Sequence, residues 1–354
     1  MRLKIASVLL IFSVTLLAQA PAQDASIARE IHQLRKAAGA QPPSDDWNSL
    51  KARVMQSLDL ADRAARAGRN YLALEEMGRA MVVLEANQEA AQSAEAGLKQ
   101  FEKAWSKASV QLVADDQKAR QWDWGSAPAA VRAIGETAQG ESLVLLEAAR
   151  AYAGATQPQA GYFYVGQAKA QAHLAQFAHT LELRVSQTSA PRDVSDEIRD
   201  LQQQINAEFQ PPKSIERHSD FIVLNATLKL AGDLNRQKFY AGALYKYLAA
   251  VQLLAMLDRN VPAQDARGQL RDAVAAARKA LNAKRDDSIA QIFVERAETL
   301  VISDAQPSDA DWANAQAIVR KVLPAYEAAV AASRQPKRQA ASLVRLTLVR
   351  WPYT

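Results

Sequence analysis

The chain contains no cysteine, few aromatic residues and few residues that break helices. Without cysteine, its 354 residues provide neither a disulfide nor the thiol that a bacterial lipoprotein needs after its signal. Aromatic residues make up only 6%, and 13 glycines and 13 prolines are thinly spread. By contrast, 49% of the residues are hydrophobic and 72 are alanine, the strongest helix former. This composition excludes a disordered chain and predicts an all-α protein.

Signatures of common enzymes are also missing. The sequence has no GxSxG, HExxH, SxxK or phosphate-loop motif. Of the four histidines, His173 and His179 lie six positions apart, about 120° around a helix, whereas paired metal ligands need spacings of three or four. His32 and His218 stand alone. We therefore predict no catalytic residue, no metal site and no cofactor.

Residues 1–22 have the pattern of a secretory signal peptide. Arg2 and Lys4 precede an apolar run over 5–17, which is shorter than the roughly 20 residues of a membrane-spanning helix. We expect cleavage after Ala22, with an uncleaved anchor as the alternative, and no membrane span later in the chain. The expected location is the periplasm, or otherwise the extracellular medium.

Positive charge is concentrated at the C-terminus. The net charge of the whole chain is +5, and residues 334–354 contain five basic residues and no acidic one. Residues 23–333 carry 36 basic and 38 acidic side chains, a balance that argues against nucleic acid as a partner. Apolar side chains alternate with the basic ones in this tail, which suggests binding to an anionic surface or an acidic partner; capping of the fold is the alternative.

Helical periodicity divides the body of the chain into hairpins. One apolar stripe follows Ser44 or Asp45 as a cap and ends at a Gly-Arg-Asn turn; it comprises Trp47, Leu50, Val54, Leu58, Ala61 and Ala65. A second stripe follows directly, so residues 46–90 are predicted to form a helical hairpin. Near the other end, Ser308 and Asp311 form a capping-box pattern before a helix that Pro324 is expected to kink.

Two of these hairpins align without a gap, 170 positions apart. The first contains Leu60, Ala61, Ala64, Gly68, Asn70, Ala73, Leu74, Met77 and Ala80; the second contains Leu230, Ala231, Leu234, Lys238, Tyr240, Ala243, Leu244, Tyr247 and Ala250. Each stretch of about 25 residues resembles a tetratricopeptide (TPR) repeat, although the closing proline of that family is absent from both. The remaining interpretation is an ordinary alanine-rich hairpin.

The resemblance implies helix pairs with a concave face that binds a peptide or protein segment. Residues whose spacing would place them on such a face are Asn70, Glu75, Arg79, Asn225, Lys229, Arg236 and Tyr245, and the tail adds Arg345, Arg350 and Trp351. Two aromatic groups, at 122–124 and 162–164, are expected to pack inside the fold rather than to form a stacking platform.

One enzymatic alternative rests on Glu141. Glu141-Ser142 after Gly140 resembles the Glu-Ser pair of lytic transglycosylases, which implies a cell-wall hydrolase with Glu141 as general acid and base. The rest of that signature is missing, and Glu141 is better explained as the first-turn acid of a helix opening at Gly140, where the helix dipole favours an acid.

Together these patterns predict an exported, all-α, non-enzymatic protein. The fold is expected to consist of antiparallel helical hairpins, either a TPR-like array or a two-lobed bundle, with lobes at 23–190 and 191–333 and the tail at 334–354. The expected function is a protein–protein interaction or assembly module of the cell envelope. A purely structural helical bundle is the third alternative.

Overall fold

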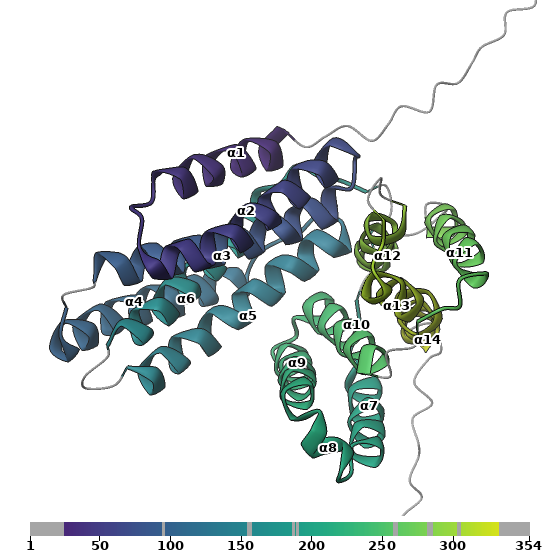
Figure 1. Cartoon of the computed structure of the whole chain (residues 1–354). Helices are drawn as coiled ribbons and strands as arrows, with labels where there is room; N and C mark the ends of the chain where they lie inside the picture. The colour runs from purple at the N-terminus through teal and green to yellow at the C-terminus, as the bar shows by residue number, and fades with distance from the viewer. Residues whose placement is uncertain are drawn as a thin grey trace, which may run out of the picture.

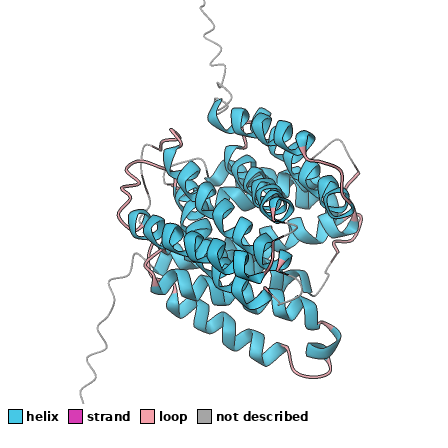
Figure 2. Ribbon diagram, turned by 90° about the vertical axis from the view of Figure 1, so that its left-hand side faces the viewer, coloured by secondary structure: helices cyan, strands magenta, loops and turns pink. Residues whose placement is uncertain are grey.

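The computed structural model confirms the all-α class. It describes residues 25–93, 96–153, 158–185, 188, 191–257, 261–281, 286–302 and 306–332, and no strand occurs among them. Residues 1–22, where a signal peptide is expected, and the basic tail at 334–354 lie outside these residues. Figure 2 shows the described chain as helices joined by loops.

The helices fall into two groups that follow one another in the chain, called the N-terminal unit and the C-terminal unit, and one apolar core runs through both (Figure 1). The N-terminal unit contains α1 (Ala25–Ala40), α2 (Asp45–Arg66), α3 (Asn70–Gln92), α4 (Leu98–Ala119), α5 (Ala129–Tyr152) and α6 (Gln159–Thr180). The C-terminal unit contains α7 (Ser195–Glu208), α8 (Lys213–Glu216), α9 (His218–Arg236), α10 (Tyr240–Leu257), α11 (Ala266–Leu281), α12 (Ser288–Val301), α13 (Asp309–Ala317), the π-helical turn η1 (Ile318–Val322) and α14 (Leu323–Ala332). The boundary expected between residues 190 and 191 falls in the connection from α6 to α7.

The hairpin predicted at 46–90 is present as α2 and α3. Ser44 is the N-cap of α2 and accepts a hydrogen bond from the Trp47 backbone N–H at 3.1 Å, which satisfies one of the unpaired donors of the first turn. Side chains of the predicted stripe, Trp47, Val54 and Leu58 among them, are buried. Burial of one apolar face, rather than helix propensity alone, holds this pair together.

The two stretches that align 170 positions apart have the same turn. Between α2 and α3, Gly68 has a φ of 70°, and the Arg69 N–H donates to the Ala64 carbonyl at 2.8 Å. Between α9 and α10, Lys238 has a φ of 65°, and the Phe239 N–H donates to the Leu234 carbonyl at 2.9 Å. Glycine adopts this left-handed conformation at no steric cost, whereas lysine does not.

Helix contacts repeat between the units in the same chain order. In the N-terminal unit α1 packs on α2 and α3, α3 on α6, and α4 on α5 and α6. In the C-terminal unit α7 packs on α9 and α10, α10 on α13, and α11 on α12 and α13. Helices α2, α3 and α5 therefore correspond to α9, α10 and α12.

Two of the contacts between the units are reciprocal under this correspondence. Helix α5 packs on α10, and α12 packs on α3. Exchange of each helix for its counterpart converts one contact into the other, as in the isologous interface of a two-fold dimer. The arrangement brings α3 and α10 to the two sides of one junction.

The change of helix geometry expected at Pro324 begins before that residue. The π-helical turn over Ile318–Val322 joins α13 to α14, so the helix runs on without a break in the residue sequence. Proline has no N–H to donate to the carbonyl four residues earlier, so the α-helical hydrogen-bond ladder is interrupted within this turn. The predicted capping box is present, since the Asp311 N–H donates to the Ser308 hydroxyl at 3.2 Å.

Helix α10 is the described segment that bears on the expectation of no later membrane span. Within the described residues, Tyr240–Leu257 is long and apolar enough for a span by length and composition, with a mean hydropathy of 1.2. Of this stretch, 56% is buried inside the fold, where α5, α9 and α13 pack on it. A buried core helix has the same composition, and such burial favours that role.

Candidate functional site: a cavity between the two units

A cavity of about 840 Å³ lies where the two units meet. Its walls come from α2, α3, α5 and α6 of the N-terminal unit and from α9, α10, α12 and α13 of the C-terminal unit. The polar and charged lining residues are Arg53, Gln56, Ser57, Glu75, Arg79, Thr137, Glu141, Gln171, Thr227, Tyr245, Lys246, Gln252, Arg296 and Asn314. Ligand sites are typically concave and frequently lie between domains, so this cavity is the candidate site.

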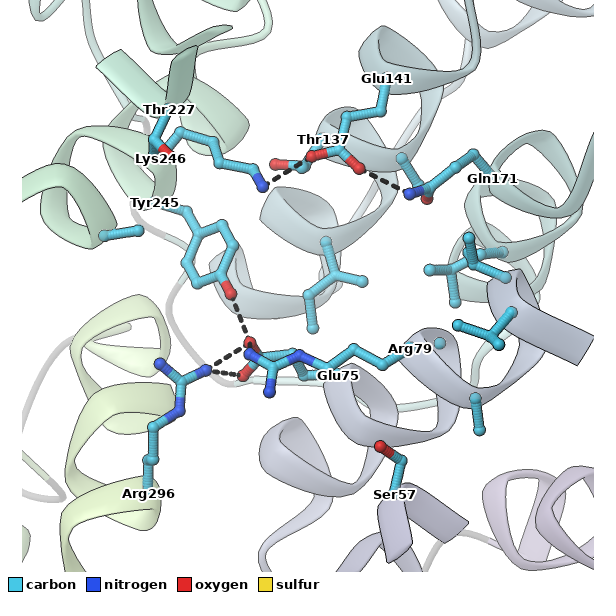
Figure 3. A pocket seen from close by; sticks show the side chains of 18 of the residues that line it. Ser57, Glu75, Arg79, Thr137, Glu141, Gln171, Thr227, Tyr245, Lys246 and Arg296 are labelled. Carbon is cyan, nitrogen blue, oxygen red and sulfur yellow. Dashed lines mark hydrogen bonds and ion pairs between the residues drawn. The ribbon is translucent and has the colours of Figure 1, made fainter. Parts of the chain in front are cut away.

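Glu75 is the centre of the polar network in this cavity (Figure 3). Its carboxylate accepts a hydrogen bond from the Tyr245 hydroxyl at 2.7 Å and another from Arg79 Nη2 at 2.7 Å. Arg296 Nη2 from α12 binds both of its oxygens. Side chains from α3, α10 and α12 therefore meet at one carboxylate that is only 8% exposed.

The ionisation of this cluster follows from its geometry. Burial alone would raise the pKa of Glu75, but the positive charges of Arg296 and Arg79 and the hydrogen bond from Tyr245 lower it to about 2. Burial and the neighbouring Glu75 carboxylate raise the pKa of the Tyr245 hydroxyl. Glu75 is thus an anion and Tyr245 a neutral donor at any physiological pH.

A second polar network forms the opposite wall (Figure 3). Lys246 Nζ on α10 lies 2.6 Å from Glu141 on α5, and the other Glu141 oxygen accepts from Gln171 Nε2 on α6 at 2.5 Å. Beside Arg296, Gln252 accepts from Arg296 Nη1 at 3.3 Å and donates to Asn314 Oδ1 at 2.5 Å. The cavity thus has side-chain amides and cations from both units, whereas its two carboxylates, Glu75 and Glu141, come from the N-terminal unit.

Two buried glutamates position the helices that carry these residues. Glu295 on α12 accepts the Leu72 N–H at 3.0 Å, in the first turn of α3, and Glu136 on α5 accepts the Gly242 N–H at 2.9 Å, in the first turn of α10. Leu72 and Gly242 occupy equivalent positions of the two aligned hairpins. A carboxylate at a helix N-terminus pairs an otherwise unpaired donor and complements the helix dipole. The two contacts fix α3 and α10 across the junction.

The absence of a side chain at Gly242 also favours the close approach of α5 to α10. A Cβ atom at this position would lie 3.1 Å from the Glu136 Cβ atom and 3.1 Å from the Thr137 backbone nitrogen.

Burial also affects the ionisation of the two capping glutamates. It raises the pKa of Glu136, although Arg132 and the Gly242 N–H oppose that effect. It likewise raises the pKa of Glu295, against the opposing effects of Arg278 and the Leu72 N–H.

Some predicted binding residues lie in the cavity and others do not. Arg79 and Tyr245 line it together with Glu75. Asn70, the first residue of α3, is buried, and Asn225 is half-buried and accepts from Gln202 Nε2 at 3.3 Å between α9 and α7. Outside the cavity, Lys229 is exposed and Arg236 is ion-paired with Asp233 on the surface of α9. The tail residues Arg345, Arg350 and Trp351 lie outside the described residues.

The structure corrects the expected local setting of Glu141. Gly140 and Glu141 lie in the middle of α5 rather than at the start of a helix. A Cβ atom on Gly140 would lie 2.4 Å from Leu234 Cδ2, so this glycine permits α9 to approach α5. Since both oxygens of Glu141 are bonded to Lys246 and Gln171, its place in this structure is in the cavity network.

Aromatic side chains of residues 122–124 pack against the core, as expected. Trp122 stacks on His179 with ring centroids 4.5 Å apart, and Trp124 meets the same ring edge-on at 5.3 Å. Both tryptophans are half-buried beside the main apolar core. Tyr162 is buried at the far end of the N-terminal unit, where its ring meets Phe101 edge-on at 5.3 Å.

Sequence reasoning missed the cavity residues Arg296, Lys246 and Gln171. The sequence does contain a sign that Arg296 is unusual. Glu295 and Arg296 are two adjacent charged residues inside the apolar helix α12, where Phe293 and Ala297 are buried. Charged side chains in such a stretch are seldom buried without partners, so a distant partner was implied. The partner itself, Glu75, is 221 positions away.

Comparisons of the chain with protein families, with curated proteins and with solved structures found no match. Among the described residues, no group of three or more histidine, aspartate or glutamate side chains is placed to hold a metal ion.

Proposed function

We propose that this protein is an exported, non-enzymatic binding protein of the cell envelope that holds a segment of a partner protein in the cavity between its two units. The observation that carries this proposal is the cavity itself, which is about 840 Å³ in volume and is lined from both units. Its walls combine aliphatic side chains with polar and charged groups that converge from both units, as a site for a polar ligand requires.

The energetics of the junction support a role beyond stability. Glu75 and Arg296 are removed from water at the junction, with side chains 8% and 16% exposed. Desolvation of such a pair is costly, and apolar residues of similar size frequently give equal or greater stability. The binding of a ligand in the cavity therefore explains the presence of this charged network better than a contribution to stability does.

A peptide ligand agrees with both the lining and the family resemblance. The two hairpins that resemble TPR repeats contribute α3 and α10, which face each other across the cavity. Proteins of that family generally bind extended peptide segments, and the side-chain amides and hydroxyls of the lining can pair with a peptide backbone. Export rests on residues 1–22, and the C-terminal tail is proposed as a second contact with an anionic surface.

Site-specific photo-crosslinking tests this proposal. A photoreactive side chain is placed at Gln56 or Thr227, on opposite walls of the cavity, in tagged full-length protein made in intact cells; matched controls carry it at Lys103 or Gln204, which are exposed elsewhere. We expect both cavity positions, but neither control, to capture the same partner through one segment of its sequence. Capture of unrelated proteins, or equal capture from the controls, would contradict the proposal.

A cavity-filling variant then tests whether that segment enters the cavity. Ala249→Phe on α10 places a ring in the cavity, whereas Ala255→Phe on the same helix, at a similarly half-buried position outside the lining, serves as the matched control. Binding of a synthetic peptide of the captured segment should be lost only in Ala249→Phe.

Incubation of the protein with purified cell wall tests the proposal that it is not an enzyme. We expect no release of soluble fragments. Release that Glu141→Gln abolishes would show a hydrolase instead.

A further inference from the structure

The lining of the cavity has more positive than negative charge. Its cationic side chains are Arg53, Arg79, Lys246 and Arg296, and its carboxylates are Glu75 and Glu141. Glu76 approaches Arg79 from outside the lining at 2.8 Å, so the surrounding charge stays positive even when this third carboxylate is ionised. An anionic ligand is therefore favoured over a cationic one.

Hydrogen-bond donors of the cavity are also in excess. Arg79 uses one Nη2–H on Glu75 and one Nη1–H on Glu76, which leaves three of the five guanidinium donors. Its side chain is 53% exposed, so these donors are accessible. Arg53 is exposed and has no ion pair with any described residue, and Lys246 keeps two of its three N–H groups after pairing with Glu141.

Each carboxylate oxygen of the lining already has at least one partner. Glu75 is bonded to Tyr245, Arg79 and Arg296, and both oxygens of Glu141 have partners. A carboxylate from the ligand can accept two of the remaining N–H groups in a charge-assisted, bidentate manner. The guanidinium geometry of Arg53 and Arg79 suits such a group better than it suits a neutral amide.

Aliphatic surface adjoins these donors and favours a peptide over a fatty acid. Val54, Val83, Leu253 and Met256 line the cavity, but Gln56, Ser57 and Thr227 interrupt the apolar surface. A fatty acyl chain would leave these amides and hydroxyls without partners, whereas a peptide backbone can satisfy them. An aliphatic side chain of the peptide would contact the valines and leucine beside the carboxylate.

We infer that the segment bound in the cavity is an acidic peptide, with one carboxylate held by Arg53 and Arg79 next to an aliphatic side chain. This inference rests on the proposed binding function and adds the chemical class of the ligand. The carboxylate comes from an aspartate or glutamate side chain or from the C-terminus of the partner chain.

Selection from two random decapeptide libraries tests the inference with purified full-length protein. One library presents a free C-terminal carboxylate, and the other is fused through its C-terminus so that only side chains provide a carboxylate. Selection on Ala249→Phe in parallel identifies peptides that need the open cavity. We expect cavity-dependent peptides to be enriched in Asp or Glu at one position in both libraries, or in aliphatic C-terminal residues in the first library alone, which distinguishes the two sources.

Binding of a selected peptide is then compared among variants of α2. Arg53→Gln should weaken binding about tenfold or more, the effect of losing one hydrogen bond to a charged group. Lys51→Gln, an exposed change on the same helix outside the lining, should leave affinity unchanged. Melting curves of both variants show whether the fold is retained, which is expected because Arg53 is exposed.

Three results separate the inference from the function on which it rests. Cavity-dependent peptides without enriched carboxylates, or with enriched Lys and Arg, would overturn the inference and leave the binding function standing. If Arg53→Gln left the affinity for a selected peptide unchanged, the proposed contact between Arg53 and the peptide carboxylate would be wrong. Absence of any peptide that distinguishes the wild-type cavity from Ala249→Phe would overturn both.

Discussion

Removal of the Glu295 carboxylate should weaken the junction that forms the cavity. Glu295 is 0% exposed, and its oxygens accept from the Leu72 N–H at 3.0 Å, from Arg278 Nη1 at 3.0 Å and from Gln291 Nε2 at 2.9 Å. The perturbation is Glu295→Ala, which removes all three acceptor contacts without adding a group that clashes.

The magnitude follows from the groups left behind. The Leu72 N–H is buried and would lose its partner, which costs about 1–3 kcal/mol. Arg278 is 20% exposed and can turn toward water, so the loss of its pair costs less than the 3–5 kcal/mol of a fully buried ion pair. We therefore expect Glu295→Ala to lower the free energy of unfolding by about 3 kcal/mol, mostly through the unpaired N–H.

Glu295→Gln separates the hydrogen bond from the charge. Glutamine keeps an oxygen for the Leu72 N–H, so we expect a cost below about 1 kcal/mol near neutral pH. The two proteins should also differ in how the free energy of unfolding depends on pH. Because burial raises the folded-state pKa of Glu295, the stability that its protonated form contributes is present below the unfolded value and is lost as pH rises through the folded pKa. Glu295→Gln should lack that decline.

Urea denaturation measures these differences, provided that the denaturant slope stays constant. Glu136→Ala, the equivalent change at the α10 cap, should cost a similar amount, and the exposed Glu208→Ala should stay within about 0.5 kcal/mol. A Glu295→Ala variant that loses less than about 1 kcal/mol, or that loses no more than Glu295→Gln, would refute the view that these glutamates hold the two units by capping helices.

Further predictions concern ionisation and backbone geometry. Because the pKa of Glu75 is lowered to about 2 in the folded state, its contribution to stability is present above the unfolded value of about 4.5 and is lost as pH falls toward 2; Glu75→Gln should remove about 3 kcal/mol of this acid-dependent change in urea denaturation. Lys238→Gly should raise the free energy of unfolding by about 0.5–1 kcal/mol, since glycine relieves the positive φ, and a loss of stability would contradict this. Gly242→Ala should cost about 1–3 kcal/mol in thermal denaturation through the close contact with α5, whereas Gly268→Ala, with no atom near the added Cβ, should be neutral or stabilising.

Local features of this protein were predictable from the sequence alone. The cap at Ser44, the hairpin of α2 and α3 and the capping box at Ser308 depend on residues within a few positions of one another, and spacing and turn chemistry report such contacts directly. The alignment of two stretches 170 positions apart also predicted that α9 and α10 are the counterparts of α2 and α3, and the two pairs share the same turn.

Only the tertiary structure decided where the candidate site lies. Glu75 meets Tyr245, 170 positions away, and Arg296, 221 positions away, because α5 packs on α10 and α12 packs on α3. Helical periodicity indicates which face of a helix is apolar but not which distant helix covers it, since any apolar stripe of suitable length can pack on another. The roles of Glu136 and Glu295 as buried helix caps were also decided only by the tertiary structure, because each accepts a hydrogen bond from a backbone N–H of a helix remote in the chain.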